Sequence, residues 1–328
     1  MPVLLIVIIA LSLVFDFLNG FHDSSNIVAT MISSRAMPPR VALAITAVAE
    51  FSGPFLFGVA VATTIGSEVV DPSAISSAVI IAALSSAILW NIFTWYFGFP
   101  SSTSHALIGG LIGAVGVAKG LSTIRLAGLE KVLVALFVSP ILGLVIGYLV
   151  LKAIYFLARG AGPNINTTFK RGQLVTSLAL ALSHGTNDAQ KTMGIIAMAM
   201  VTTGFTTTFR VPVWVIALSA SAIALGTALG GWRLIKTLGG RFYKIRPIHA
   251  FASQLTSASI ILGAALLGGP VSTTQVVSSS IMGVGAADRV SKVRWTVARD
   301  LAVAWLLTIP ISALVAAGLY LLVNLFVK

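Results

Sequence analysis

The chain has no cysteine and few charged residues, and both deficits limit what it can be. Without cysteine, disulfide bonds and thiol chemistry are excluded. Asp, Glu, Lys and Arg make up only 9% of the 328 residues, whereas hydrophobic residues make up 57% and the mean hydropathy is +1.00. A soluble domain of this length carries far more charge, so the composition predicts a polytopic helical membrane protein.

Acidic residues are scarcer still, nine against 21 basic residues, which gives a formal net charge of +12. A basic excess can indicate nucleic-acid binding, but here the basic residues gather in a few loops between apolar segments. Such loops are typical of the cytoplasmic side of a membrane protein. We therefore expect a multi-pass protein of the inner (plasma) membrane, surrounded by the lipid bilayer and without a nucleic-acid partner.

Ten apolar segments follow one another along the chain. They cover residues 2–34, 41–63, 78–99, 105–118, 132–158, 172–204, 212–231, 249–268, 275–287 and 300–327. The first is interrupted by polar residues at 20–26 and the sixth at 185–191. Because segment 172–204 is too long for one straight crossing, we expect two half-helices that meet at 185–191, and a similar break at 20–26.

The two interruptions are copies of one polar motif, GFHDSSN at 20–26 and GTNDAQK at 185–191. A carboxylate at the centre of a bilayer costs roughly 3 kcal/mol, so Asp23 and Asp188 call for a function. Each could instead cap a half-helix or remain protonated. Their duplication favours a coupling-ion site, and their oxygens and those of the neighbouring amides are hard ligands suited to Na⁺. The expected Na⁺ ligands are Asp23, Asn26, Glu50, Asn187 and Asp188.

A second element is also duplicated, FPSSTSH at 99–105 and GPVSTTQ at 269–275. An apolar segment precedes and follows each copy, so we expect two helical hairpins that dip into the membrane with these residues at their tips. Hydroxyls and free backbone N–H groups after a proline can bind an oxyanion, although single Ser or Thr residues often bond only to their own helix. The expected anion ligands are Ser102, Thr103, Ser104, Ser272, Thr273 and Thr274, with amide help from Gln190 or Asn26.

With hairpins that do not cross, each half of the chain spans the membrane three times, so the halves insert in opposite orientations. The predicted fold is therefore all-α, with two inverted-topology repeats, broken helices and re-entrant hairpins. Its divisions are an N-terminal repeat at 1–158, a cytoplasmic linker at 159–171 and a C-terminal repeat at 172–328. Residues near 68 and 125 should share the outer side, and residues near 240 and 292 the cytoplasmic side.

The sequence leaves the roles of several polar residues undecided. Asp16 lies seven residues before Asp23 and either supports it on the same helix face or sits near the outer interface. Lys191 either neutralises substrate charge or pairs with Asp188. The four histidines lack the spacing of a metal site, and His22 and His184 are placed to hydrogen-bond near the two motifs.

These motifs resemble those of the inorganic phosphate transporter (PiT) family. Residues 185–191 are similar to its G-x-N-D-x-x-N signature, and 99–105 and 269–275 to its P-x-S-x-T-H element. WRLIKTLG at 232–239 and Ala304-Trp305 with Thr308 and Pro310 resemble its C-terminal half. The resemblance covers nearly the whole chain and implies cation-coupled phosphate uptake, with both aspartates and both hydroxyl clusters at one site.

The chain departs from the family pattern at several positions. Phe21-His22 stands where a small residue and Asn are usual, and Lys191 stands where Asn is usual. Gln275 replaces a His, and Gln254 replaces the Glu of many relatives. These losses weigh against a purely proton-coupled mechanism and leave the cation stoichiometry open. The short 159–171 segment, in place of a large hydrophilic domain, is typical of a compact prokaryotic member.

We therefore expect a secondary transporter that imports inorganic phosphate with Na⁺ by alternating access, without enzymatic activity or any cofactor besides the coupling ion. The nearest alternatives are an H⁺-coupled permease for phosphate or metal-phosphate, and a sulfate permease. The least favoured is an intramembrane aspartyl hydrolase with Asp23 and Asp188 as catalytic pair, which gives the hydroxyl clusters no role. The sequence leaves the oligomeric state, including a homodimer, open.

Overall fold

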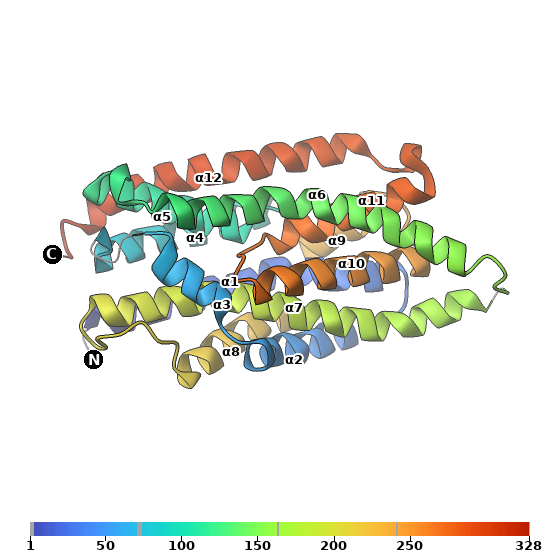
Figure 1. The fold of residues 1–328 in the computed structure, drawn as a ribbon, viewed down its shortest axis with the longest axis horizontal. Coiled ribbons are helices and arrows are strands. Elements are labelled where there is room, and N and C mark those ends of the chain that lie inside the picture. The colour runs from blue at the N-terminus through green and yellow to red at the C-terminus, as the bar shows by residue number, and fades with distance from the viewer. Residues whose placement is uncertain (1–2, 71–73, 163, 241, 328) are drawn as a thin grey trace.

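The computed structural model describes residues 3–70, 74–162, 164–240 and 242–327, and these form a bundle of long helices with both chain ends at one end of the bundle (Figure 1). The helices are α1 Val3–Ser33, α2 Pro39–Phe57, α3 Ala60–Thr63, α4 Ser77–Phe97, α5 Thr103–Lys119, α6 Leu126–Leu157, α7 Ile165–Thr202, α8 Val213–Leu229, α9 Trp232–Gly240, α10 Pro247–Leu266, α11 Thr273–Arg289 and α12 Trp295–Val323. Short helical turns lie at Thr64–Glu68, Leu121–Thr123 and Val290–Lys292. Six of the helices, α1, α2, α4, α6, α10 and α12, are long and apolar enough to cross a membrane.

The two polar motifs lie inside unbroken helices, so the prediction of breaks at 20–26 and 185–191 is wrong. α1 runs for 31 residues and α7 for 38. The motif glycines serve close packing instead: a Cβ on Gly20 would lie 2.0 Å from the Ile223 carbonyl oxygen, and one on Gly185 would lie 2.2 Å from that of Glu50. Neither motif contains proline, and other segments of the chain supply partners for Asp23, Asn26, Asn187 and Asp188, so the helices continue through the motifs.

The broken helix pair of this fold is α8 and α9, which meet at an angle of 71°. Gly230 at the junction has φ 73°, a left-handed conformation that favours glycine. The segment between the halves is also shorter than the predicted linker at 159–171. Helix α7 begins at Ile165, so residues 165–171 are helical. The division into two repeats at this connection stays a prediction.

The hairpins α4–α5 and α10–α11 are re-entrant, as predicted. The indole N–H of Trp305 donates to the Pro100 carbonyl across 3.2 Å, and Trp305 lies ten residues into α12, about 15 Å along its axis. In the second hairpin, Gly269 lies against Ala135, nine residues into α6. α4 and α10 are long enough to span alone, but both hairpin tips end inside the bundle.

The helices pair across the two halves in an exchanged pattern. α1 packs on α8 and α7 packs on α2, whereas α5 packs on α12 and α11 packs on α6. The matching glycines make matching contacts: a Cβ on Gly113 would lie 2.0 Å from the Ala313 carbonyl oxygen, and one on Gly283 would lie 2.1 Å from that of Leu144. This is the exchange that two inverted repeats related by a pseudo-two-fold axis should show.

The loops meet as the predicted topology with two re-entrant hairpins requires. The Arg125 backbone N–H donates to the Val69 carbonyl across 3.0 Å, which joins the loops near residues 68 and 125 at one end. The Arg294 N–H donates to the Phe242 carbonyl across 3.2 Å, which joins the basic loops near 240 and 292. Which end faces the cytoplasm stays a prediction.

Candidate functional site

The two motif aspartates meet at one hydroxyl group of the second hairpin. Thr273 Oγ1 lies 3.1 Å from Asp23 Oδ2 and 3.0 Å from Asp188 Oδ2. α1 supplies Asp23, α7 supplies Asp188, and Thr273 begins α11 directly after the hairpin tip. A hydroxyl carries a single proton and can donate it to only one carboxylate at a time. The other carboxylate oxygen therefore needs a different positive partner.

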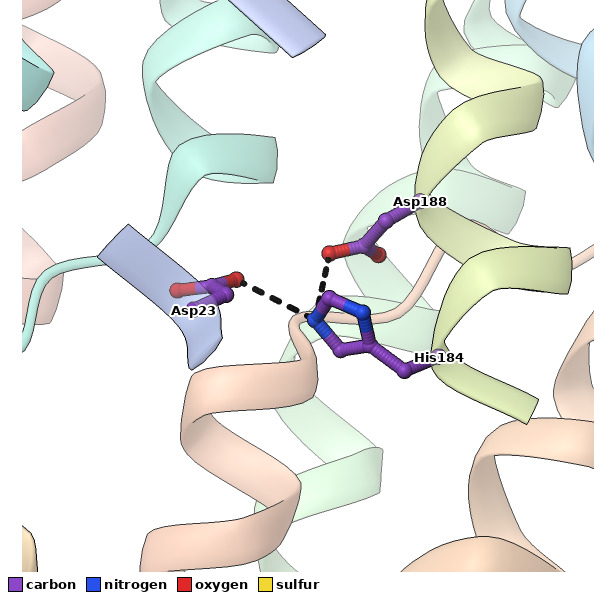
Figure 2. Close-up of side chains that lie close together, drawn as sticks. All are labelled: Asp23, His184 and Asp188. Atoms are coloured by element: carbon purple, nitrogen blue, oxygen red, sulfur yellow. Dashed lines mark ion pairs between the residues drawn. The ribbon is translucent and has the colours of Figure 1, made fainter. Parts of the chain in front are cut away.

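The imidazole of His184 lies between the same two carboxylates (Figure 2). Its Nε2 is 3.3 Å from Asp188 Oδ2 and 3.6 Å from Asp23 Oδ2, and its Nδ1 is 2.7 Å from Glu50 Oε1. His184 precedes Asp188 by four residues, one helical turn, so both side chains extend from the same face of α7. One ligand atom from each of Asp23, His184 and Asp188 lies within 4.8 Å of the others, which is close enough to hold one cation.

Asp23, the aspartate of the first half, is surrounded by neutral groups and His22. Thr274 donates to Asp23 Oδ1 across 3.0 Å, and His22 Nδ1 lies 2.9 Å from the same oxygen. The Asn26 amide donates to Thr274 across 3.0 Å, which connects α1 to the second hairpin. The Asn26 side-chain oxygen is buried and accepts no hydrogen bond among the described residues. It is therefore available as a cation ligand.

In the second half, a buried ammonium group faces the aspartate. Lys191 Nζ donates to Asp188 Oδ1 across 2.5 Å, to Ser104 Oγ across 2.6 Å and to the Val271 carbonyl across 3.2 Å. Ser104 also donates to the Val271 carbonyl across 3.1 Å, so both hairpin tips are tied to α7 through this group. Only 1% of the Lys191 surface is exposed, and all three of its protons have oxygen partners.

Two other cluster hydroxyls, those of Ser102 and Ser272, organise the starts of the two hairpin helices. Ser102 accepts from the backbone N–H of His105 across 3.1 Å, and Ser272 accepts from that of Gln275 across 3.4 Å. Each is the N-cap of its helix, α5 or α11, and both are buried. Two helix N-termini, whose dipoles favour anions, therefore begin at the site from opposite hairpins.

Four acidic side chains are buried in this part of the molecule. Asp16, Asp23, Glu50 and Asp188 are each at most 1% exposed, and Lys191 is the only buried Lys or Arg among the residues that the structure describes. Buried charges are stable only when opposite charges or protons compensate them. Lys191 and the buried imidazoles of His22 and His184 are the side chains that can supply positive charge to these acids.

A sequence model of the phosphate transporter family matches residues 19–166 and 158–316. The chain belongs to this family. It is 44% identical over 327 residues to a probable low-affinity inorganic phosphate transporter of Bacillus subtilis strain 168, with 98% of both chains covered. It is 45% identical to a protein of the same description from Rhizobium meliloti strain 1021, with 98% of this chain and 97% of that one covered.

A solved structure described as the sodium-dependent phosphate transporter has the same fold, with a TM-score of 0.90 at 25% identity, covering 98% of this chain and 99% of that one. The predicted PiT resemblance and all-α polytopic fold are confirmed, as is a multi-pass plasma-membrane location. The family consists of transporters for inorganic phosphate, so the protein is a transporter and the aspartyl hydrolase alternative is set aside.

Most of the predicted ligands of this phosphate transporter lie around Thr273, the threonine shared by Asp23 and Asp188. Gln190 does not. Its amide oxygen accepts from the Val61 and Ala62 N–H groups across 2.8 and 3.3 Å, and its amide nitrogen donates to the Gly58 carbonyl across 2.6 Å. Gln190 therefore caps the start of α3 rather than facing the hydroxyl clusters. Asn187 donates to the Gly269 carbonyl across 3.1 Å, and its buried oxygen accepts no hydrogen bond among the described residues.

The sequence left two residues undecided that the structure resolves. Asp16 is fully buried and accepts from Thr192 of α7 across 2.5 Å, so it supports the contact between α1 and α7. His184, expected only to hydrogen-bond near the motifs, joins Glu50 to both aspartates. The four-residue spacing of His184 and Asp188 was the signal that could have placed it at the centre.

Proposed function

We propose that this protein imports inorganic phosphate together with Na⁺ by alternating access. Phosphate lies between the two hairpin tips in this proposal, and Na⁺ lies beside the aspartates. The proposed anion ligands are Ser102, Thr103, Ser104, Ser272, Thr273 and Thr274 with Asn26, and the proposed Na⁺ ligands are Asp23, Asn26, Glu50, Asn187 and Asp188. Gln190 is left out because backbone groups of 58–62 occupy its amide.

The shared threonine carries the proposal. A single hydroxyl proton lies between Asp23 Oδ2 and Asp188 Oδ2, so a monovalent cation could interact with whichever of the two oxygens does not accept that proton. The free oxygens of Asn26 and Asn187 supply further hard ligands. The sodium dependence in the description of the matching solved structure supports the choice of cation.

Cation and anion then depend on each other for binding. Phosphate brings one or two negative charges into a site that already holds the carboxyl groups of Asp23, Glu50 and Asp188. Bound Na⁺ offsets that charge, while hydroxyl and helix N-terminal N–H groups satisfy the phosphate oxygens. Such mutual dependence is what prevents a symporter from moving either ion alone.

Equilibrium binding of phosphate to the purified protein tests this coupling. Phosphate affinity should rise steeply with Na⁺ and be about tenfold or more weaker when choline replaces Na⁺, since coupling free energies are typically 1–3 kcal/mol. Sulfate should compete weakly. Phosphate affinity that is independent of Na⁺ would contradict the Na⁺ coupling. Equal competition by sulfate would show that the site binds tetrahedral oxyanions in general.

One observation favours a second candidate, the transport of a divalent metal-phosphate complex with H⁺. An imidazole nitrogen with two carboxylates, as in Asp23, His184 and Asp188, is a ligand set that suits a divalent cation better than Na⁺. This candidate predicts that chelating divalent ions abolishes uptake at any Na⁺ concentration. Undiminished uptake in the presence of a chelator would exclude it.

A further inference from the structure

The two polar motifs make the same contact with opposite hairpins, but with different chemistry. Aligning Asp23 with Asp188 places Asn26 opposite Lys191, and aligning the clusters places Ser104 opposite Thr274. Asn26 Nδ2 lies 3.0 Å from Thr274 Oγ1, and Lys191 Nζ lies 2.6 Å from Ser104 Oγ. Asn26 in the first half and Lys191 in the second therefore hold equivalent positions, one with a neutral amide and the other with an ammonium group.

The oxygen atoms around the Lys191 ammonium are those that an alkali cation would take. They are the carboxylate of Asp188, the hydroxyl of Ser104 and the carbonyl of Val271, at 2.5, 2.6 and 3.2 Å. Carboxylate, hydroxyl and carbonyl oxygens are the ligands of hard cations in proteins. The ammonium is buried and donates all three of its protons to them, so it holds the place that such an ion would fill.

We propose that the Lys191 ammonium acts as a resident cation at Asp188, so that the protein carries one Na⁺ fewer per phosphate than the same site would with asparagine in both motifs. This inference rests on the proposed Na⁺ symport. The lysine supplies charge that offsets phosphate, yet it stays with the protein when phosphate leaves. It also neutralises Asp188 in the empty carrier. The carrier can therefore return to its outward-facing state without a transported cation at that carboxylate.

The test replaces each residue by its counterpart from the other half. Lys191→Asn removes the resident charge and adds an amide oxygen, as in the first motif. The slope of log phosphate affinity against log Na⁺ concentration should then increase by about one, because one more ion binds with the substrate. The charge moved per phosphate, measured by electrical recording of proteoliposomes, should become more positive by about one elementary charge.

Two further variants keep the test decisive. Asn26→Lys places an ammonium in the first half and should lower the slope by about one, whereas Lys191→Arg retains the charge and should keep the wild-type slope. Na⁺-dependent shifts in thermal unfolding of the purified proteins report the same binding without any need for transport. Lys191→Asn should gain a Na⁺-dependent shift larger than that of the wild type.

The inference is overturned if Lys191→Asn shows the wild-type Na⁺ slope and the wild-type thermal shift. Lys191 would then be a structural partner of Asp188 only. If Lys191→Asn gives no folded protein, an unchanged slope in Asn26→Lys overturns it in the same way. Failure of the proposed function is distinguishable, since it appears in the wild type as phosphate binding without Na⁺ dependence, whatever the lysine variants do.

Discussion

In the first half of the protein, Asp23 faces the hydroxyls of Thr273 and Thr274 and the imidazoles of two histidines, its neighbour His22 and His184. In the second half, Asp188 faces a buried ammonium and shares His184 with Glu50. The helices around both aspartates nevertheless pack in the same exchanged pattern, with glycines at the same crossings. The comparison shows the same packing around both aspartates, whereas single residues on that scaffold set the charge beside each of them.

The largest expected difference between the halves is the side of the membrane on which equivalent loops lie, because the halves are predicted to have opposite orientations. Ser122 and Ser291 are exposed residues at near-equivalent places after the second helix of each hairpin. Because the chain has no native cysteine, Ser122→Cys and Ser291→Cys can be labelled singly with an impermeant thiol reagent. Ser122→Cys should label only from outside the cell and Ser291→Cys only from the cytoplasm. Labelling of both from one side would contradict an inverted repeat.

Removing either aspartate charge should stop transport, but the consequences for stability should differ. Asp23→Asn and Asp188→Asn should both abolish Na⁺-driven phosphate uptake, because asparagine keeps the shape and removes the charge. Asp188→Asn also leaves the Lys191 ammonium buried without its carboxylate, at a cost of about 3–5 kcal/mol. Thermal unfolding should therefore show a large loss for Asp188→Asn that Lys191→Asn partly restores. Normal uptake by both single variants would refute the ion-site assignment.

The equivalent threonines of the two hairpins should differ in effect. Thr273 bonds to both aspartates, whereas no hydrogen bond joins Thr103 to either one among the described residues. Thr273→Val should therefore weaken phosphate binding by roughly 10- to 100-fold, since hydrogen bonds to charged groups contribute about 1.5–3 kcal/mol. Thr103→Val should cost less, and the double variant should lose Na⁺ binding only when phosphate is present. Equal losses in a binding titration would mean that the aspartate contacts of Thr273 add nothing.

The smallest and most equal effects should come from the glycines at the helix crossings. Gly113→Ala and Gly283→Ala each bring a Cβ to about 2 Å from a facing carbonyl oxygen, so the helices must separate. Each should destabilise the protein by about 1–3 kcal/mol. Gly318→Ala in α12 is the matched control, because a Cβ there meets no atom within 4 Å. A clear difference between the two crossing variants in thermal unfolding would show that the halves are not packed alike.

The sequence was sufficient to predict the membrane class, the re-entrant hairpins and the loops that meet at each end. Those features depend on apolar length, duplicated motifs and charge placement, all of which are local in the chain. The predicted breaks at 20–26 and 185–191 were wrong because polar residues inside a membrane helix do not require unwinding when neighbouring helices offer them hydrogen-bond partners. The position of the actual break, at Gly230, depends on packing against other helices.

The roles of individual polar residues were harder to predict, because they depend on contacts between distant parts of the chain. Gln190 looked like an anion ligand beside Asp188, yet it faces α3 instead of the hairpin tips. Lys191, one residue further along α7, points to Ser104 from the other half of the chain. The helical spacing held part of this information, since Lys191 lies three residues after Asp188 on the same face and Gln190, two residues after it, does not. Which other helix that face meets depends on the fold.

The coupling of phosphate to Na⁺ is tested most directly by uptake of labelled phosphate into proteoliposomes, with the Na⁺ and pH gradients imposed separately. An inward Na⁺ gradient at equal pH should drive phosphate accumulation, and a pH gradient without Na⁺ should not. Accumulation driven by the pH gradient alone, with no response to Na⁺, would contradict the account.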